Sequence, residues 1–316
     1  MIVFGVLVLS LLGGELFARY GLELGDPVLM QSHAAIEYLP KPDQDVRIYG
    51  SRHRINAYGM RSEDPPQNAQ AVRVLVLGDS VIYGGRRTDH SALSTTITQA
   101  KLRESFDQDV WVGNASAGSW GPGNWLAYVE AFGTFEADVA IVVLSPHDIG
   151  DTPRFDPTWA ATQTTQPPFS ALGVAMQEVW SRVRSRLGSK AAAKNPNDLN
   201  QPGIPIPEPD EPHRITAEQD LTALLGIFAK QKIPAAVLYF PEADADGRHD
   251  SVRGRFKEIA EANGAKFIDL RERLLNEDPA TNPAYRDRMH PSHEGQRRIA
   301  DAMVEAVKAL IATKPQ

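Results

Sequence analysis

Cysteine occurs nowhere among the 316 residues of this chain. Without thiols the protein cannot form disulfides, use a catalytic cysteine or build a metal site on thiolate ligands. The absence does not indicate a compartment, because an exported protein can fold without disulfides. Chemistry that depends on cysteine is therefore excluded, and any side-chain nucleophile must be of another kind.

Basic residues are the minority among the charges, with 33 Lys and Arg against 40 Asp and Glu, and the formal net charge at pH 7 is −7. No long basic stretch offsets this balance. A nucleic-acid partner requires a positive surface that meets its phosphates, so we expect no such partner. With 42% hydrophobic residues, the chain can bury one sizeable α/β core and still carry appendages.

The N-terminal segment lacks charge from Met1 to Gly14 and is rich in Val, Leu, Ile and Phe. It also lacks the basic start and the clear small-residue cleavage site of a removable signal peptide. The uncharged run is shorter than the roughly 20 residues that usually cross a bilayer, but the segment continues through Glu15 to Arg19. We predict an uncleaved signal-anchor, a transmembrane segment over residues 1–20; a helix of the soluble core is the alternative.

A serine stands directly after an apolar strand. The run from Val72 to Leu77 is short, β-branched and almost continuously apolar, as in a strand that is buried on both faces of a parallel sheet. Gly78, Asp79 and Ser80 follow, which places Ser80 just past the carboxyl end of the strand, where open α/β sheets bind their ligands. A serine hydroxyl is a weak nucleophile, so it needs a neighbouring base and a group that orients this base.

Asp287 and His290 can supply both groups. Side chains three residues apart on a tight turn can point to one side, so Asp287 can accept a hydrogen bond from Nδ1 of His290 while Nε2 faces Ser80. We therefore expect a serine hydrolase with Ser80, Asp287 and His290 as its catalytic residues.

Four segments of the chain resemble the motif blocks of the SGNH/GDSL hydrolase family. They are residues 78–84, 114–121, 145–148 and 287–295, in the order that the family has. The resemblance implies a three-layer α/β/α sandwich with a mainly parallel, flavodoxin-like sheet and a reaction without cofactor or metal. The residues that we expect to support the site, within these blocks, are Asp79, Asn114 and Asp148.

The resemblance also implies an oxyanion hole. The backbone N–H groups of Ser80 and Gly118 would donate to the oxyanion, and the glycine spacing leaves Gly121 as an alternative to Gly118. The family's third donor is an asparagine, but this chain has His147, whose ring nitrogen donates only in the right tautomer or when protonated. If His147 does not reach the oxyanion, the protein would be slow, substrate-assisted or no longer catalytic.

We predict three regions: the signal-anchor at 1–20, a lead-in segment at 21–70 and the hydrolase domain at 71–312. Strands that alternate with helices indicate a parallel sheet with helices on both faces. Residues 151–213 form a Pro-rich insertion in the last region. Inside it, apolar residues recur at steps of three and four, which predicts an amphipathic helix. We expect this helix to pack as a lid; a helix on a membrane surface is the alternative.

The leading functional hypothesis is an anchored, extracytoplasmic carbohydrate esterase that removes acetyl or similar groups from a glycan through an acyl-serine. The glycan is inferred from the anchor and the resemblance, and the outward orientation from the resemblance alone. The alternatives are an O-acyltransferase of exopolysaccharide or envelope assembly and a degenerate, non-catalytic glycan-binding or assembly subunit. A metal-dependent phosphoesterase is disfavoured, because the chain has no HExxH motif and Pro291 interrupts helical spacing between His290 and His293.

Overall fold

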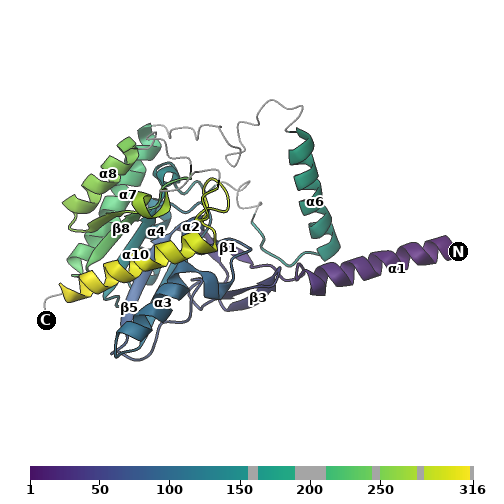
Figure 1. Cartoon of the computed structure of the whole chain (residues 1–316), viewed down its shortest axis with the longest axis horizontal. Helices are drawn as coiled ribbons and strands as arrows, with labels where there is room; N and C mark the ends of the chain where they lie inside the picture. Colours follow the sequence, from purple (N-terminus) through teal and green to yellow (C-terminus); the bar gives the residue numbers. More distant parts are fainter. Residues whose placement is uncertain (156–162, 189–210, 244–249, 276–280, 314–316) are drawn as a thin grey trace.

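Five parallel strands form the central sheet, in the order β6-β5-β7-β8-β9 (Figure 1). The structure is a computed structural model that describes residues 1–155, 163–188, 211–243, 250–275 and 281–313. The strands are β5 (Val72–Gly78), β6 (Val110–Ser116), β7 (Val139–Leu144), β8 (Ala235–Tyr239) and β9 (Lys266–Asp269). Because all five run in the same direction, their carboxyl ends meet at one edge of the sheet.

Helices cover both faces of the sheet, because successive side chains of each strand point to opposite sides. On one face, Leu75 and Leu77 pack with α4 (Pro122–Phe132), α7 (Glu211–Lys230) and α8 (Asp250–Ala262). On the other, Val74 and Val76 pack with α3 (Ser94–Ser105) and α10 (His293–Ala312). The predicted three-layer α/β/α sandwich with a parallel sheet is therefore confirmed. The short elements are α2 (Ser80–Tyr83), η2 (His90–Ala92), η3 (Pro146–Ile149) and α9 (Arg271–Leu274).

The lead-in segment contains two antiparallel hairpins that the sequence pattern did not predict. The first pairs β1 (Met30–His33) with β2 (Glu37–Pro40), and the second pairs β3 (Gln44–Ile48) with β4 (Ser51–Ile55). Two side chains that follow β6, one before α4 and one in its first turn, reach the first hairpin. Trp120 Nε1 donates to Tyr38 O at 3.0 Å, and Asn124 Nδ2 donates to Ile36 O at 2.8 Å. The first hairpin is thus tied to the loop that follows β6.

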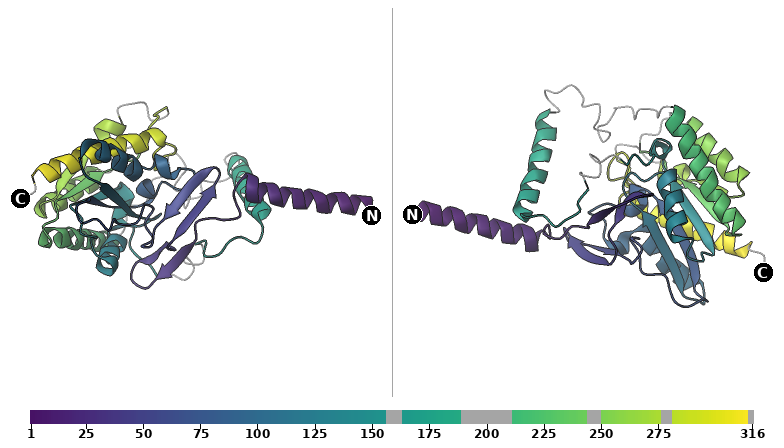
Figure 2. Two further views of the ribbon diagram at one scale, coloured as in Figure 1. Left: turned by 90° about the horizontal axis from the view of Figure 1, so that it is seen from below. Right: turned by 180° about the vertical axis from the view of Figure 1, so that it is seen from behind.

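Two helices stand apart from the sheet (Figures 1 and 2). One is α1 (Ile2–Leu16), which projects away from the rest of the protein and continues into the helical turn η1 (Phe17–Gly21). Residues Ile2–Gly21 are long and apolar enough to cross a membrane. The other is α6 (Ala171–Gly188), the amphipathic helix expected in the insertion, which packs against α1 and η1. Of the predicted insertion at 151–213, residues 156–162 and 189–210 lie outside the described residues.

Arg61 is a buried guanidinium that holds the chain segment after α2. It donates to the carbonyl oxygens of Tyr83, Gly85 and Thr88, the second of these at 3.0 Å. Its own backbone N–H donates to Asn114 O in β6 at 3.0 Å. One buried side chain of the lead-in segment therefore satisfies three backbone carbonyls next to the turn that carries Ser80.

We expect Arg61→Ala to lower the free energy of unfolding by about 3 kcal/mol or more, because each buried acceptor left without its donor costs about 1–3 kcal/mol. Urea denaturation of the full chain in detergent measures this loss. The control is Arg52→Ala in β4, which removes an exposed ion pair with Asp45 that contributes about 1 kcal/mol at most. Equal losses in the two variants would contradict the role given to Arg61.

Candidate active site

Ser80 is the first residue of α2, directly after β5 and Asp79. The Asp79 carboxylate caps α2 by accepting a hydrogen bond from Val81 N at 2.9 Å. The strand passes into the helix within two residues because position 78 is glycine. A Cβ on Gly78 would lie only 2.7 Å from Cγ1 of Ile82. This tight turn presents the Ser80 side chain at the carboxyl edge of the sheet.

The fold brings His290 and Asp287 to Ser80 across 210 residues of sequence. Nε2 of His290 lies 3.0 Å from Ser80 Oγ. Nδ1 of His290 lies 2.8 Å and 3.0 Å from the two carboxylate oxygens of Asp287. The His290 and Asp287 side chains are 23% and 35% exposed, so an arriving molecule can reach them from solvent. The three predicted catalytic residues thus lie in one hydrogen-bonded chain, as a serine nucleophile requires.

The Asp287 carboxylate is held by backbone as well as by the imidazole. It accepts hydrogen bonds from Met289 N at 3.0 Å and His290 N at 2.9 Å. Burial opposes its ionisation, but the bonds from His290 and from these amides outweigh burial and lower the pKa of Asp287 to about 2. An ionised Asp287 accepts a hydrogen bond from the Nδ1–H group, and this tautomer directs the lone pair of Nε2 at Ser80.

Gly118 lies in the tight loop after β6, beside Ser119, whose φ of 57° is left-handed. The Tyr38 hydroxyl donates to Gly118 O and ties this loop to the first hairpin. A Cβ on Gly118 would meet no atom within 4 Å, so the space beside it is open. The N–H of the alternative, Gly121, already donates to Asn124 Oδ1 at 2.9 Å. The geometry therefore favours Gly118 over Gly121 as a donor to a bound oxyanion.

Asn114 lies beneath the turn that carries Ser80. Its side-chain amide donates to Ile82 O and to Thr95 Oγ1, both at 3.1 Å. Ser116 Oγ donates to its side-chain oxygen. Asn114 is completely buried, so it connects β6 to α2 and α3 and does not face an approaching substrate.

His147 in η3 has partners other than the predicted oxyanion. Its Nε2 lies 3.0 Å from Asp79 Oδ2 and 3.6 Å from Asp148 Oδ1, and its Nδ1 lies 3.9 Å from Glu242 Oε1. Both ring nitrogens thus face carboxylates. Asp148 also caps η3 by accepting a hydrogen bond from Ser145 N at 2.6 Å. The structure therefore places His147 and Asp148 as buried neighbours of Asp79, the residue that caps α2.

The carboxylates around His147 determine its charge. Burial disfavours the imidazolium, but Asp148 and Asp79 outweigh burial and raise the pKa of His147 to about 10. Burial, with Asp79, raises the pKa of Asp148 well above its usual value. Ligand atoms of Asp79, His147 and Asp148 lie within 4.8 Å of one another, a spacing that also suits a metal ion. With Nε2 of His147 at 3.0 Å from Asp79 Oδ2, the three side chains form an ion-pair cluster.

Two buried residues of this region were not recognised in the sequence. Glu242 follows β8, and its Oε2 lies 3.4 Å from Arg288 Nη2. Arg288 belongs to the turn of Asp287 and His290, and its carbonyl accepts a hydrogen bond from Ala243 N at 2.9 Å. Glu242 could have been recognised from the sequence, because it follows an apolar strand and therefore lies at the carboxyl edge of the sheet. This pair connects the turn that carries His290 to the end of β8.

Comparisons with known proteins give a matching family and several similar solved structures. The sequence matches the GDSL-like lipase/acylhydrolase family over residues 76–298. Similar solved structures include TesA, at 15% identity and TM-score 0.48 over 75% of this chain and 99% of that chain. A second is the psychrotrophic esterase EstA from Pseudoalteromonas sp., at 15% identity and TM-score 0.46 over 76% and 99%. A third is a catalytic mutant of Axe2, an acetylxylan esterase from Geobacillus stearothermophilus, at 14% identity and TM-score 0.44 over 77% and 96%. A comparison with curated protein sequences finds no match.

We expect the stability of the protein to fall as pH rises from about 6.5 to about 10. The folded-state pKa of His147, about 10, lies above the unfolded value of about 6.5. Its stabilising contribution is therefore complete below pH 6.5 and is lost as pH approaches 10, a change of a few kcal/mol. Chemical denaturation at a series of pH values measures the slope.

The variant His147→Gln keeps a hydrogen-bond donor that does not titrate, so its stability should change less over this pH window. The control is His213→Gln, which replaces an exposed histidine on α7 and should retain the wild-type slope. The same slope in His147→Gln and in the wild type would contradict the charge assigned to His147.

Proposed function

Because the chain belongs to the GDSL-like lipase/acylhydrolase family and is an ester hydrolase, we propose that Ser80 is its nucleophile and that His290 and Asp287 activate it. One observation carries this proposal: Ser80 Oγ lies 3.0 Å from Nε2 of His290, whose Nδ1 lies 2.8 Å from an Asp287 oxygen. A base within hydrogen-bond reach of the nucleophile, oriented by a third group, is the requirement for covalent catalysis by serine.

In the proposed reaction, His290 takes the proton from Ser80 Oγ as this oxygen attacks the ester carbonyl. The tetrahedral intermediate collapses to an acyl-serine, and His290 returns the proton to the leaving alkoxide. Water then attacks the acyl-serine while His290 takes a proton from it. As the bond between the acyl carbon and Ser80 Oγ breaks, His290 returns this proton to Ser80 Oγ, and the acid is released. Asp287 stays ionised throughout and stabilises the imidazolium.

We place the oxyanion between the backbone N–H groups of Ser80 and Gly118. Each such donor, aimed at the charge that develops in the transition state, contributes about 3–4 kcal/mol to catalysis. His147 acts one step away, because its imidazolium holds the Asp79 carboxylate that caps the helix of Ser80. In this proposal His147 is a positioning residue and not the third oxyanion donor.

The proposed substrate is an acylated glycan. We place the catalytic domain outside the cytoplasm, beside a membrane in which α1 anchors the protein. Two observations support a bulky, hydrated alcohol as the leaving group. The His290 and Asp287 side chains are partly exposed, and the space beside Gly118 is open. A deep, closed pocket would suit a small or purely apolar ester better.

A fluorophosphonate tests the activated serine, because it reacts with a nucleophilic hydroxyl and leaves a stable adduct. On the full-length wild type in detergent we expect one adduct by intact mass, absent in Ser80→Ala and His290→Ala. The control Ser91→Ala, which changes an exposed serine, should keep the adduct. No adduct on folded wild type would contradict the mechanism and favour a non-catalytic, glycan-binding subunit.

Product analysis then separates hydrolysis from transfer. With an acetylated oligosaccharide, an esterase releases acetate whether or not a second glycan is present. Transfer of the acetyl group to that glycan would instead identify an O-acyltransferase, which uses the same acyl-serine.

Tyr38→Phe should lower kcat about 10-fold with little change in KM, because the hydroxyl fixes the loop of Gly118, whose N–H acts mainly in the transition state. Steady-state hydrolysis of an acetyl ester measures both constants. The matched control is Tyr128→Phe, which removes a hydrogen bond to Tyr58 O and keeps the ring that packs on Trp120. An equal fall of kcat in both variants would contradict the role of Tyr38.

A further inference from the structure

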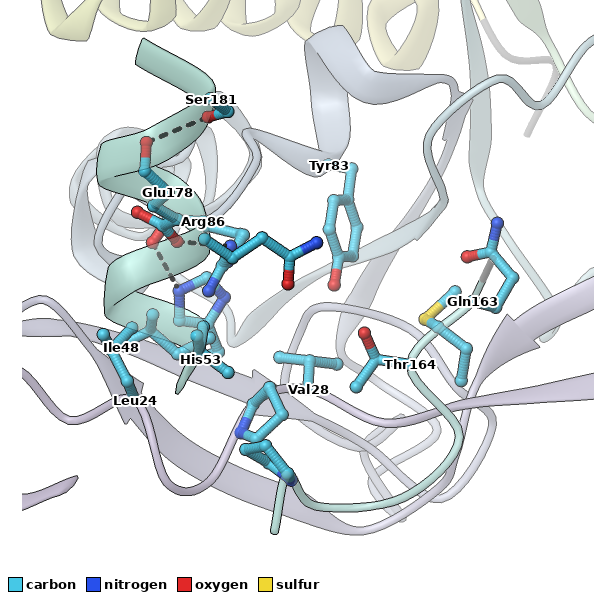
Figure 3. A pocket seen from close by; sticks show the side chains of 15 residues that line it. Leu24, Val28, Ile48, His53, Tyr83, Arg86, Gln163, Thr164, Glu178 and Ser181 are labelled. Carbon is cyan, nitrogen blue, oxygen red and sulfur yellow. Dashed lines mark hydrogen bonds and ion pairs between the residues drawn. The ribbon is translucent and has the colours of Figure 1, made fainter. Parts of the chain in front are cut away.

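Helix α6 has one polar face, and this face is turned toward the catalytic domain. Glu178 accepts a hydrogen bond from Arg86 at 2.9 Å and another from the Tyr49 hydroxyl. Figure 3 shows the contact between Arg86 and Glu178 beside a cavity of about 550 Å³ that His53 and Tyr83 also line. The α6 residues that line the cavity are Val174, Gln177, Glu178 and Ser181. Their spacing of three and four places them on one side of the helix.

The opposite face of α6 is apolar and exposed. Met176, Val179 and Trp180 are 63%, 56% and 59% exposed, and Val183 extends the same stripe. Met176, Val179 and Trp180 line an apolar groove of about 670 Å³ between α6 and α1, together with Phe17. A helix with one polar and one exposed apolar face needs a partner for the second.

The junction with α1 fixes how this apolar face is oriented. Glu15 of α1 accepts hydrogen bonds from Ala171 N and Leu172 N, both at 3.0 Å, and so caps the start of α6. Arg19 forms an ion pair with Glu15 at 2.7 Å and donates to Phe169 O at 3.2 Å. Both helices are therefore held together at one corner.

Figures 1 and 2 show that α6 runs crosswise to α1, at the end of α1 that is nearer the catalytic domain. If α1 crosses a bilayer, α6 lies along the bilayer surface. The apolar face of α6 then points toward the bilayer that α1 crosses, and its polar face points toward the catalytic domain.

We propose that α6 is an interfacial helix whose apolar face, formed by Met176, Val179, Trp180 and Val183, inserts into a phospholipid bilayer beside α1. The occupant is lipid because the apolar face continues directly into the candidate membrane span Ile2–Gly21. Trp180 and Arg184 fit this position, since the guanidinium lies 5.8 Å from the indole centroid and both groups favour the boundary between headgroups and acyl chains.

The inference rests on the membrane anchoring in the proposed function, but not on the ester chemistry. It gives α6 a role different from a lid that packs on the core. Two points of attachment, α1 across the bilayer and α6 along it, would hold the catalytic domain in one orientation relative to the membrane.

The absence of cysteine makes the test direct, because a single introduced cysteine can carry a spin label. The full chain is reconstituted in vesicles of phosphatidylcholine and phosphatidylglycerol. Val179→Cys reports the apolar face of α6, and Ser181→Cys is the matched control on the opposite face. Leu9→Cys reports α1. Accessibility to O2, which concentrates in the bilayer, is compared with accessibility to a water-soluble nickel chelate.

We expect labels at positions 179 and 9 to be relaxed mainly by O2 and the label at 181 mainly by the nickel chelate, a several-fold difference in the accessibility ratio. Met176→Cys should repeat the result of Val179→Cys, and circular dichroism confirms that each variant is folded. If the label at position 9 lies in lipid and the label at 179 lies in water, the proposal is overturned but the membrane anchor α1 is supported. Positions 9 and 179 both in water would overturn the anchor as well. Dipolar broadening at 179 that dilution with unlabelled protein removes would identify a second copy as the occupant and overturn the proposal.

Discussion

The close approach of α2 to the end of β5 is the constraint on which the site depends. Only glycine fits at position 78, because any Cβ would clash with Ile82. The chain can therefore turn from a buried strand into a helix within two residues and leave Ser80 at the edge of the sheet. β5 is held between β6 and β7, so the same edge also receives the loop of Gly118 and the helical turn of His147. A shift of this turn would move Ser80 relative to His290 and to the loop of Gly118.

Two histidines flank this turn, and we give them different roles. His290 is partly exposed and hydrogen-bonded to one carboxylate, so it can exchange a proton with Ser80. His147 is enclosed by carboxylates that favour its charged form, and it contacts Asp79 instead of the reacting oxygen. The His290 ring must gain and lose a proton to act as a base, whereas the His147 ring must keep its charge to hold the Asp79 carboxylate. Where the family has asparagine in the block at 145–148, this chain has His147, which contacts Asp79 beneath the turn that carries Ser80.

The two hairpins outside the sandwich contact both the candidate active site and α6. The first hairpin supplies Tyr38 to the loop of Gly118. The second hairpin and the loop after α2 supply Tyr49 and Arg86 to the polar face of α6. The lead-in segment therefore contacts both the candidate oxyanion site and the helix that we assign to the membrane surface, although it contributes no strand to the central sheet.

Local pattern in the sequence determined the apolar strands, the parallel α/β/α arrangement, the amphipathic character of α6 and the two motifs that carry Ser80 and His290. Each of these depends on residues close together in the chain, or on the rule that parallel strands end at one edge. Three features needed the tertiary structure: the carboxylates that surround His147, the hairpins that position Tyr38, and the outward direction of the apolar face of α6. These depend on contacts between distant segments. His147 meets Asp79 across 68 residues, and α6 meets Glu15 across 156. A side chain's partner, and therefore its charge and its role, is decided only when such segments pack together.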